Sequence, residues 1–145
     1  MAVKYNFLVG LIREKSSEWD QARRKLMSFP AQLVQHLASS MEMPRGIMSV
    51  GMMRNPTTFA ENEYTFDKGV FGFALKFHFP VDSGFPFTTF FDFTATTVDG
   101  EVKVNFEGEV FNFILAPHDI EPGLQDLIDQ IAEVLQFRVT KHASS

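Results

Sequence analysis

The chain has 145 residues, of which 45% are hydrophobic and 21% are charged, and its formal net charge at pH 7 is −5. These values are typical of a single globular domain, here spanning residues 1–145. The chain contains no cysteine, which excludes a thiol nucleophile, a disulfide framework and a cysteine-ligated metal.

The same features set expectations about location and partners. No apolar run approaches the roughly 20 residues of a membrane span, and the first ten residues lack the cleavage site of a signal peptide. The absence of cysteine fits a reducing compartment. We therefore expect a cytoplasmic protein without a membrane span.

The charge is unevenly distributed along the chain. Residues 1–54 contain eight Lys or Arg and four Asp or Glu, whereas residues 55–145 contain five and fourteen. An acidic chain without a basic stripe argues against nucleic-acid binding. Two interpretations of the asymmetry stay open. Either both sets are solvated surface, or the basic helical part of one copy meets the acidic sheet part of another.

Two helices are predicted in the first 41 residues. In residues 4–27 one amphipathic stripe is formed by Leu8, Ile12, Lys15, Trp19, Arg23 and Leu26. This segment is expected to be one helix or two pieces hinged near Gly10. Residues 3–9 also alternate in part, which leaves a short first strand open as an alternative. The segment Ser28-Phe29-Pro30 interrupts the pattern, because Ser favours the N-cap and Pro the first turn of a new helix. The second helix is expected over residues 30–41.

A methionine-rich segment follows the second helix. Pro44 and Gly46 end the helix, and a strand begins near Ile47. Methionine fills irregular gaps in cores, but it is also over-used on adaptable binding surfaces. Packing and a contact patch for a partner or an apolar ligand are thus both open. The candidate binding residues in this segment are Met43, Met48, Met52 and Met53.

An aromatic hairpin is predicted over residues 70–98, where apolar residues alternate with small or polar ones. Residues 82–84 separate its two strands. Of the 17 phenylalanines, 14 lie between Phe59 and Phe113, and full burial of one Phe contributes roughly 1.5–3 kcal/mol. One face of the hairpin carries Phe71, Phe73, Leu75, Phe77, Phe79, Val81, Phe85, Phe87, Phe91 and Phe93.

Further strands and a final helix surround this hairpin. A weaker, acidic strand is expected over residues 57–66, and a turn at residues 67–69 leads into the hairpin. Asp-Gly at residues 99–100 and a turn near Gly108 mark the starts of two more strands. The first places Val102, Val104 and Phe106 inward, and the second, over residues 110–115, places Phe111, Phe113 and Leu115 inward. After Pro117, with a cap at Asp119 or Glu121, a helix is expected. Its apolar stripe comprises Leu124, Leu127, Ile128, Ile131, Val134, Leu135 and Arg138.

Together these elements predict an α+β fold. It comprises two N-terminal helices, an antiparallel meander sheet of five or six strands, and a long C-terminal helix, with the helices packed on the Phe-rich face. The second sheet face carries more apolar residues than a solvated face normally does, among them Phe90, which we add to the candidate binding residues. Partial cover by a helix, sheet contact in a dimer and a curled sheet around a ligand all remain open.

No known catalytic motif is present. The chain lacks His-Glu-x-x-His, Walker, Gly-x-Gly-x-x-Gly and Gly-x-Ser-x-Gly patterns. Lys76, His78 and Asp92 are expected to share one sheet face, where a solvated polar patch is the usual outcome. Although many enzyme sites leave no local signature, the sequence favours a protein without catalytic residues, cofactor or metal.

Two functions are consistent with these features. The first is a non-catalytic adaptor, or a small subunit of a homo- or hetero-oligomer, which binds a protein partner or itself through the sheet edge, the methionine patch or the second sheet face. The second follows from the alternative first strand. With it, the element order resembles the helix-grip domains of the START and plant-allergen type. That resemblance implies an apolar small molecule or lipid held between a curled sheet and the C-terminal helix.

Overall fold

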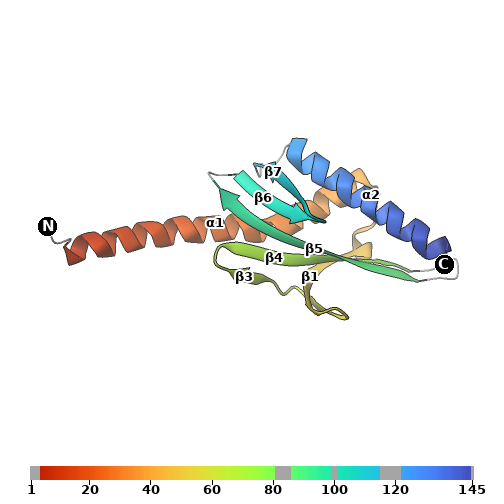
Figure 1. Cartoon of the computed structure of the whole chain (residues 1–145), viewed down its shortest axis with the longest axis horizontal. Helices are drawn as coiled ribbons and strands as arrows, with labels where there is room; N and C mark the ends of the chain where they lie inside the picture. Colours follow the sequence, from red (N-terminus) through yellow and green to blue (C-terminus); the bar gives the residue numbers. More distant parts are fainter. Residues whose placement is uncertain (1–3, 81–85, 99–100, 115–121, 145) are drawn as a thin grey trace.

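The computed structural model describes residues 4–80, 86–98, 101–114 and 122–144. Figure 1 shows a twisted sheet with helices packed beside it, and the N-terminal helix extends well beyond the sheet. The elements are α1 (Tyr5–Ser40), the 3₁₀ turn η1 (Arg45–Ile47), β1 (Met48–Asn55), β2 (Thr58–Glu61), β3 (Thr65–Asp67), β4 (Val70–Phe79), β5 (Phe87–Val98), β6 (Glu101–Phe106), β7 (Glu109–Phe113) and α2 (Pro122–Ser144). The predicted α+β class with an antiparallel sheet and a C-terminal helix is confirmed.

Seven antiparallel strands form one sheet in the order β2-β1-β4-β5-β6-β7. β3 pairs with the start of β4, on the edge that β1 occupies farther along. The predicted aromatic hairpin is the longest pairing, in which β4 and β5 match from Phe71 opposite Ala95 to Phe79 opposite Phe87. This long, in-register pair forms the centre of the sheet and sets which side chains face the helices.

The Phe-rich face is the hydrophobic core, as predicted. Phe73 stacks on Phe93, and Phe93 stacks on Phe106, each pair with ring centroids 4.9 Å apart, so that three neighbouring strands share one column of rings. Phe29 of α1 joins this column at 5.6 Å from Phe73, and α2 adds Leu127 and other apolar residues. Offset ring packing contributes beyond the burial of area, which favours this register over a slipped one.

The N-terminal helices are in fact one helix, and this part of the prediction was wrong. α1 runs from Tyr5 to Ser40 with Pro30 inside it, and residues 5–9 are helical, not a strand. Proline in a helix interior costs about 3 kcal/mol, since it removes one backbone hydrogen bond. Pro30 itself is buried against the sheet, and Leu26, Phe29 and Leu33 on either side are at most 1% exposed. Their burial offsets that cost and holds the helix continuous.

The strand expected over residues 57–66 is divided into β2 and β3, which raises the strand number to seven. Asn62 adopts a positive φ of 62°, a conformation that ends a strand and that Asn tolerates better than most residues. Between the two short strands, the Asn62 N–H donates a hydrogen bond to the Val50 carbonyl at 2.8 Å, and Arg54 forms an exposed two-pronged ion pair with Glu63 at 2.6 Å. A break at Asn62 therefore separates two strands that the alternation pattern joined.

The tight turns agree with the sequence. Lys68 and Gly69 have φ values of 52° and 80°, and Glu107 and Gly108 have 53° and 80°. Positive φ at both central residues is the hairpin geometry that matches strand twist. Val98 pairs with Glu101, as expected for a hairpin there. The predicted turns at residues 82–84 and 99–100, the inward positions Val81, Phe85 and Leu115, and the caps Asp119 and Glu121 lie outside the described residues.

Candidate functional site

The N-terminal part of α1 projects from the sheet as an arm, which we define as residues 5–18 (Figure 1). The first contacts between α1 and the sheet are made by Trp19, whose ring meets Phe66 edge-on at 5.4 Å, and by Arg23, whose guanidinium lies 5.4 Å from the same ring. Every arm residue except Val9 is exposed. The arm is thus a solvated helix held at one end by the core.

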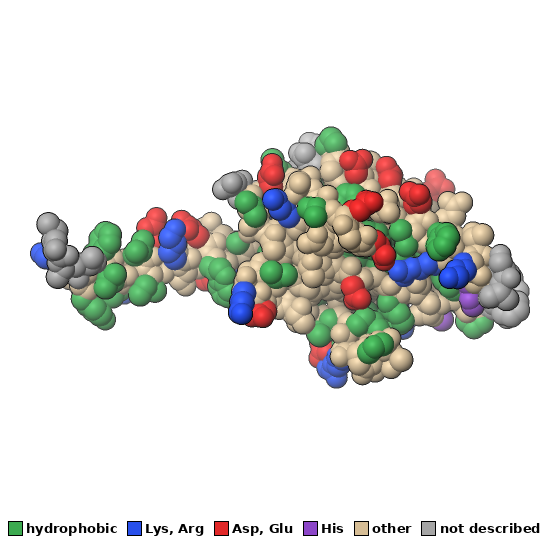
Figure 2. Space-filling model, in the orientation of Figure 1, with side chains coloured by type: hydrophobic (Ala, Val, Ile, Leu, Met, Phe, Trp, Pro, Cys, Tyr) green, Lys and Arg blue, Asp and Glu red, His purple; other side chains and the backbone are tan. Residues whose placement is uncertain are grey.

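The arm carries apolar side chains that have no covering element (Figure 2). Tyr5 is 77% exposed, Ile12 66% and Leu8 44%, and Trp19, just beyond the arm, remains 48% exposed beside its contact with Phe66. Leu11 and Phe7 lie beside them and are exposed as well. Single exposed apolar residues are normal on protein surfaces, whereas a contiguous group of them often marks an interaction surface.

These residues belong to one stripe that continues into the core. Along α1, positions at alternating steps of three and four residues are apolar except for Lys15, in the series Tyr5, Leu8, Ile12, Lys15, Trp19, Ala22, Leu26, Phe29 and Leu33. That spacing keeps one helix face turned toward a partner. The C-terminal part of the stripe is buried against the sheet, whereas its first five members form what we call the seam. The seam has the pattern of a packing face, yet only its last member, Trp19, contacts the sheet, and its other four side chains are exposed.

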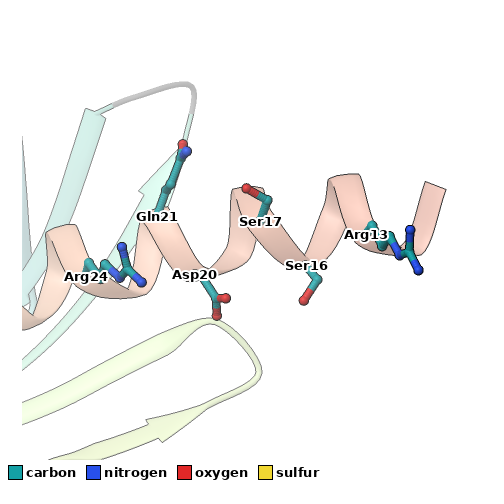
Figure 3. Close-up of a pocket in the computed structure, with 6 residues that line it drawn as sticks. All are labelled: Arg13, Ser16, Ser17, Asp20, Gln21 and Arg24. Carbon is teal, nitrogen blue, oxygen red and sulfur yellow. The ribbon is translucent and has the colours of Figure 1, made fainter. Parts of the chain in front are cut away.

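Two surface hollows lie on the arm, and each is lined by α1 alone. One, of about 490 Å³, follows the seam between Leu11 and Trp19. The other is polar, shares Ser16 with the first, continues past the arm and is lined by Arg13, Ser16, Ser17, Asp20, Gln21 and Arg24 (Figure 3). A single helix cannot enclose a small molecule, and bound ligands normally bury most of their surface. The apolar hollow therefore suits a second helix better than a small ligand.

The predicted methionine patch is distributed over two sides of the sheet. Met48 is buried in the core, and Met43 packs against the core while remaining half-buried. Met52 is opposite Ala60 and Met53 is opposite Phe59, so that these neighbours point to different faces. A binding role for these residues stays a prediction, and Met43 and Met48 already serve the packing between α1 and the sheet.

The second sheet face has a small aromatic cluster of its own. Phe90 is half-buried, and its ring lies 5.8 Å from that of Phe59, which reaches over from β2. The ammonium of Lys76 lies 5.8 Å from the Phe59 centroid, within cation–π range. Phe90 thus has a partner from its own chain, and a ligand contact there stays a prediction.

Lys76, His78 and Asp92 do share this face, yet they make separate contacts. His78 Nδ1 shares a hydrogen bond of 2.6 Å with Thr88 Oγ1 directly across the hairpin. Lys76 interacts with the Phe59 ring, and Asp92 is exposed opposite Ala74. Neither the short His78–Thr88 contact nor its surroundings provide the enclosed geometry in which a general base works.

Arg138 forms the polar contact of α2 that sequence reasoning missed. Its guanidinium donates hydrogen bonds to Thr89 Oγ1 at 2.8 Å, to the Phe90 carbonyl at 2.7 Å and to Glu107 at 2.9 Å. It also lies 4.3 Å from the centroid of the Phe91 ring. The sequence did place this arginine on the apolar stripe of the helix, and a charged side chain on a buried face usually has hydrogen-bond partners. Arg138 ties α2 to β5 and to the β6–β7 turn.

Comparisons with known proteins give no assignment: the chain matches no protein-family model, and it shows no significant similarity to a curated protein or to a solved structure. Within residues 4–80, 86–98, 101–114 and 122–144, no group of three or more His, Asp or Glu is placed to hold a metal ion. Neither α1 nor α2 has, over its described length, an apolar segment able to cross a membrane.

Proposed function

We propose that this protein is a non-catalytic interaction protein, an adaptor or a small subunit of a larger assembly, and that it binds a protein partner through the seam of its arm. One observation carries the proposal: the apolar stripe of α1 is buried along its C-terminal half and uncovered along its N-terminal half. The same helix face that stabilises the fold is thus left available for association.

The arm is prepared for binding before a partner arrives. A helix of about 14 residues is marginal in water by itself, because its first turn is costly to form. In this protein the core supplies that first turn, since Leu26, Phe29 and Leu33 fix the continuation of the same helix. Because the arm is already helical before binding, association with a partner requires less conformational entropy to be lost. Full burial of one seam side chain such as Ile12 contributes roughly 1.5–3 kcal/mol.

A pocket for an apolar small molecule is the second candidate. The observation that favours it is an open hollow of about 290 Å³ where the end of α2 meets the start of β5, lined by Phe87, Thr89, Arg138, Lys141 and His142. The resemblance to helix-grip domains required a first strand, and α1 is helical there, so this hollow alone supports the candidate. However, the adjacent Phe77 and Phe91 are 0% exposed and pack edge-on at 5.3 Å, which fills the space a ligand needs. The seam offers the stronger case.

The experiment is a matched pair of substitutions in the full chain, Ile12→Asp in the seam and Ser17→Asp on the polar side of the same helix. Each adds one carboxylate to an exposed helix position. Tagged proteins are used to isolate complexes from extracts of the source cells, and thermal unfolding verifies that both variants fold. We expect the complexes of the unmodified protein to survive Ser17→Asp and to be lost with Ile12→Asp. Identical complexes for both variants would refute a binding role for the seam.

A further inference from the structure

We propose that the partner of the seam is a second copy of this chain, with the two arms packed antiparallel about a two-fold axis near Gly10. The inference rests on the proposed function and adds the identity of the partner. A two-fold pairing uses the same surface on both copies, so a self-complementary stripe is the requirement. The seam meets that requirement in spacing, charge and length.

The spacing fixes which residues face each other. In an antiparallel pair, residues from alternate seam positions form layers. With the axis at Gly10, Leu8 packs against the partner's Ile12, and Tyr5 packs against the partner's Lys15. Each layer occurs twice by symmetry. Leu11 then flanks the partner's Leu11 at the centre, which covers the apolar hollow beside it.

Lys15 selects the antiparallel direction. In a parallel pair each Lys15 would lie against the partner's Lys15 within the seam, and like charges facing each other are unfavourable. In the antiparallel pair Lys15 lies at the end of the overlap. There its stem covers apolar surface, its ammonium remains near Glu18 at 3.5 Å, and the ring of the partner's Tyr5 offers a cation–π contact.

The flanking charges select the register. With the axis at Gly10, Lys4 lies beside the partner's Glu18, which creates two ion pairs between the copies. Moving the overlap by one seven-residue repeat would instead bring Lys4 beside the partner's Lys25. Opposite charges at these flanking positions are the usual determinant of helix pairing and orientation. The charge pattern of the arm therefore favours one register among those the spacing allows.

The length of the arm fits this overlap. Residues 5–15 of the two copies lie side by side, which is about 15 Å at 1.5 Å per residue. The sheet first contacts α1 at Trp19, beyond the end of that overlap, so the two sheets lie at opposite ends of the paired arms. An overlap this short buries less area than a permanent dimer interface does, and we expect a dissociation constant of about 1–100 μM.

The first test measures mass against concentration for the purified full chain by sedimentation. We expect a reversible dimer. Ile12→Asp should weaken it by at least about a hundredfold, because the substituted residue occurs in two layers, whereas Ser17→Asp should leave it within about threefold. A chain that stays monomeric up to about 1 mM overturns the inference.

Charge reversal tests the register. Glu18→Lys should weaken the dimer by about two- to tenfold, and the combination with Lys4→Glu should restore it. Glu14→Lys makes the same charge change off the seam and is the matched control, with no effect expected. Glu18→Lys also removes the contact with Lys15 inside one helix, and rescue by the double variant separates that effect from pairing. Absence of rescue overturns the register.

Cross-linking tests the direction, because the chain has no cysteine of its own. Leu8→Cys and Ile12→Cys variants are mixed and treated with a short thiol-specific cross-linker, and the products are identified by mass. Antiparallel pairing joins one variant to the other, whereas parallel pairing joins each variant to itself. Dominant self-linked products overturn the proposal.

Other occupants of the seam give separable results. A monomeric protein that still loses its cellular complexes with Ile12→Asp overturns the second-copy inference and leaves the proposed function in place. A monomeric protein that instead binds vesicles of neutral and acidic phospholipid, and loses that binding with Ile12→Asp, overturns both. A dimer that is disrupted by Ile12→Asp and rescued by paired charge reversal supports the inference.

Discussion

Replacing Arg138 with methionine should destabilise the fold without disturbing the arm. Methionine keeps the apolar stem that packs over Phe91 but removes the guanidinium, and with it the hydrogen bonds to Thr89 and to the Phe90 carbonyl. Because Thr89 is only 8% exposed, its hydroxyl would lose a partner in a place where water has little access. The substitution thus tests how firmly α2 is fixed to the sheet.

The expected magnitude follows from these contacts. A hydrogen bond to a charged group contributes about 1.5–3 kcal/mol. The Arg138 side chain is 31% exposed, so we discount two such bonds for solvent screening and expect a loss of about 2–3 kcal/mol. For a chain of this length that corresponds to a fall of about 5–10 °C in the unfolding temperature.

The assay is urea unfolding followed by circular dichroism, with Glu107→Gln as the control. That control removes only the exposed ion pair, which should contribute less than about 1 kcal/mol. A double-mutant cycle between the two positions isolates their coupling. If Arg138→Met cost less than about 0.5 kcal/mol, or no more than Glu107→Gln, the assignment of Arg138 as the tie between α2 and β5 would be refuted.

Three further predictions concern the fold. Gly51→Ala should cost about 1–3 kcal/mol, because a methyl group there would collide with the carbonyl of the adjacent strand, whereas Gly10→Ala, in open space on the arm, should raise stability or helicity by up to about 1 kcal/mol; urea unfolding and circular dichroism measure both. Phe93→Ala should cost about 3–5 kcal/mol in the same unfolding assay, since the ring is 2% exposed and stacks on rings from two neighbouring strands. Glu63→Gln should cost less than about 1 kcal/mol, because its ion pair with Arg54 is exposed, and a larger loss would show that the chain between β2 and β3 depends on it.

The sheet was predictable because its signal is local. Alternation of Phe with small or polar residues in residues 70–79 and 87–98 already states which face is buried, and the structure buries that face. The continuity of α1 was not predictable in this way. Pro30 is a local helix breaker, and only the burial of its neighbours against the distant sheet outweighs it.

The sequence predicted part of the candidate site. The sequence shows that the stripe containing Leu8, Ile12 and Trp19 is amphipathic, but it does not show how much of the stripe is buried by the sheet. That boundary depends on the position of Phe66 in β3, which is set by the pairing of β3 with β4. Likewise, Arg138 was placed on the correct helix face, while its partners come from residues far away along the chain.

The unbroken course of α1 has a mechanical consequence. Since no hinge or flexible linker separates the exposed end from the segment packed on the sheet, the helix behaves as a stiff lever of about 20 Å. A molecule bound to the N-terminal end of α1 is therefore held at a fixed distance and orientation relative to the sheet. An assembly built in this way would have one defined shape in small-angle scattering, and pulling on the tip would load the sheet packing directly.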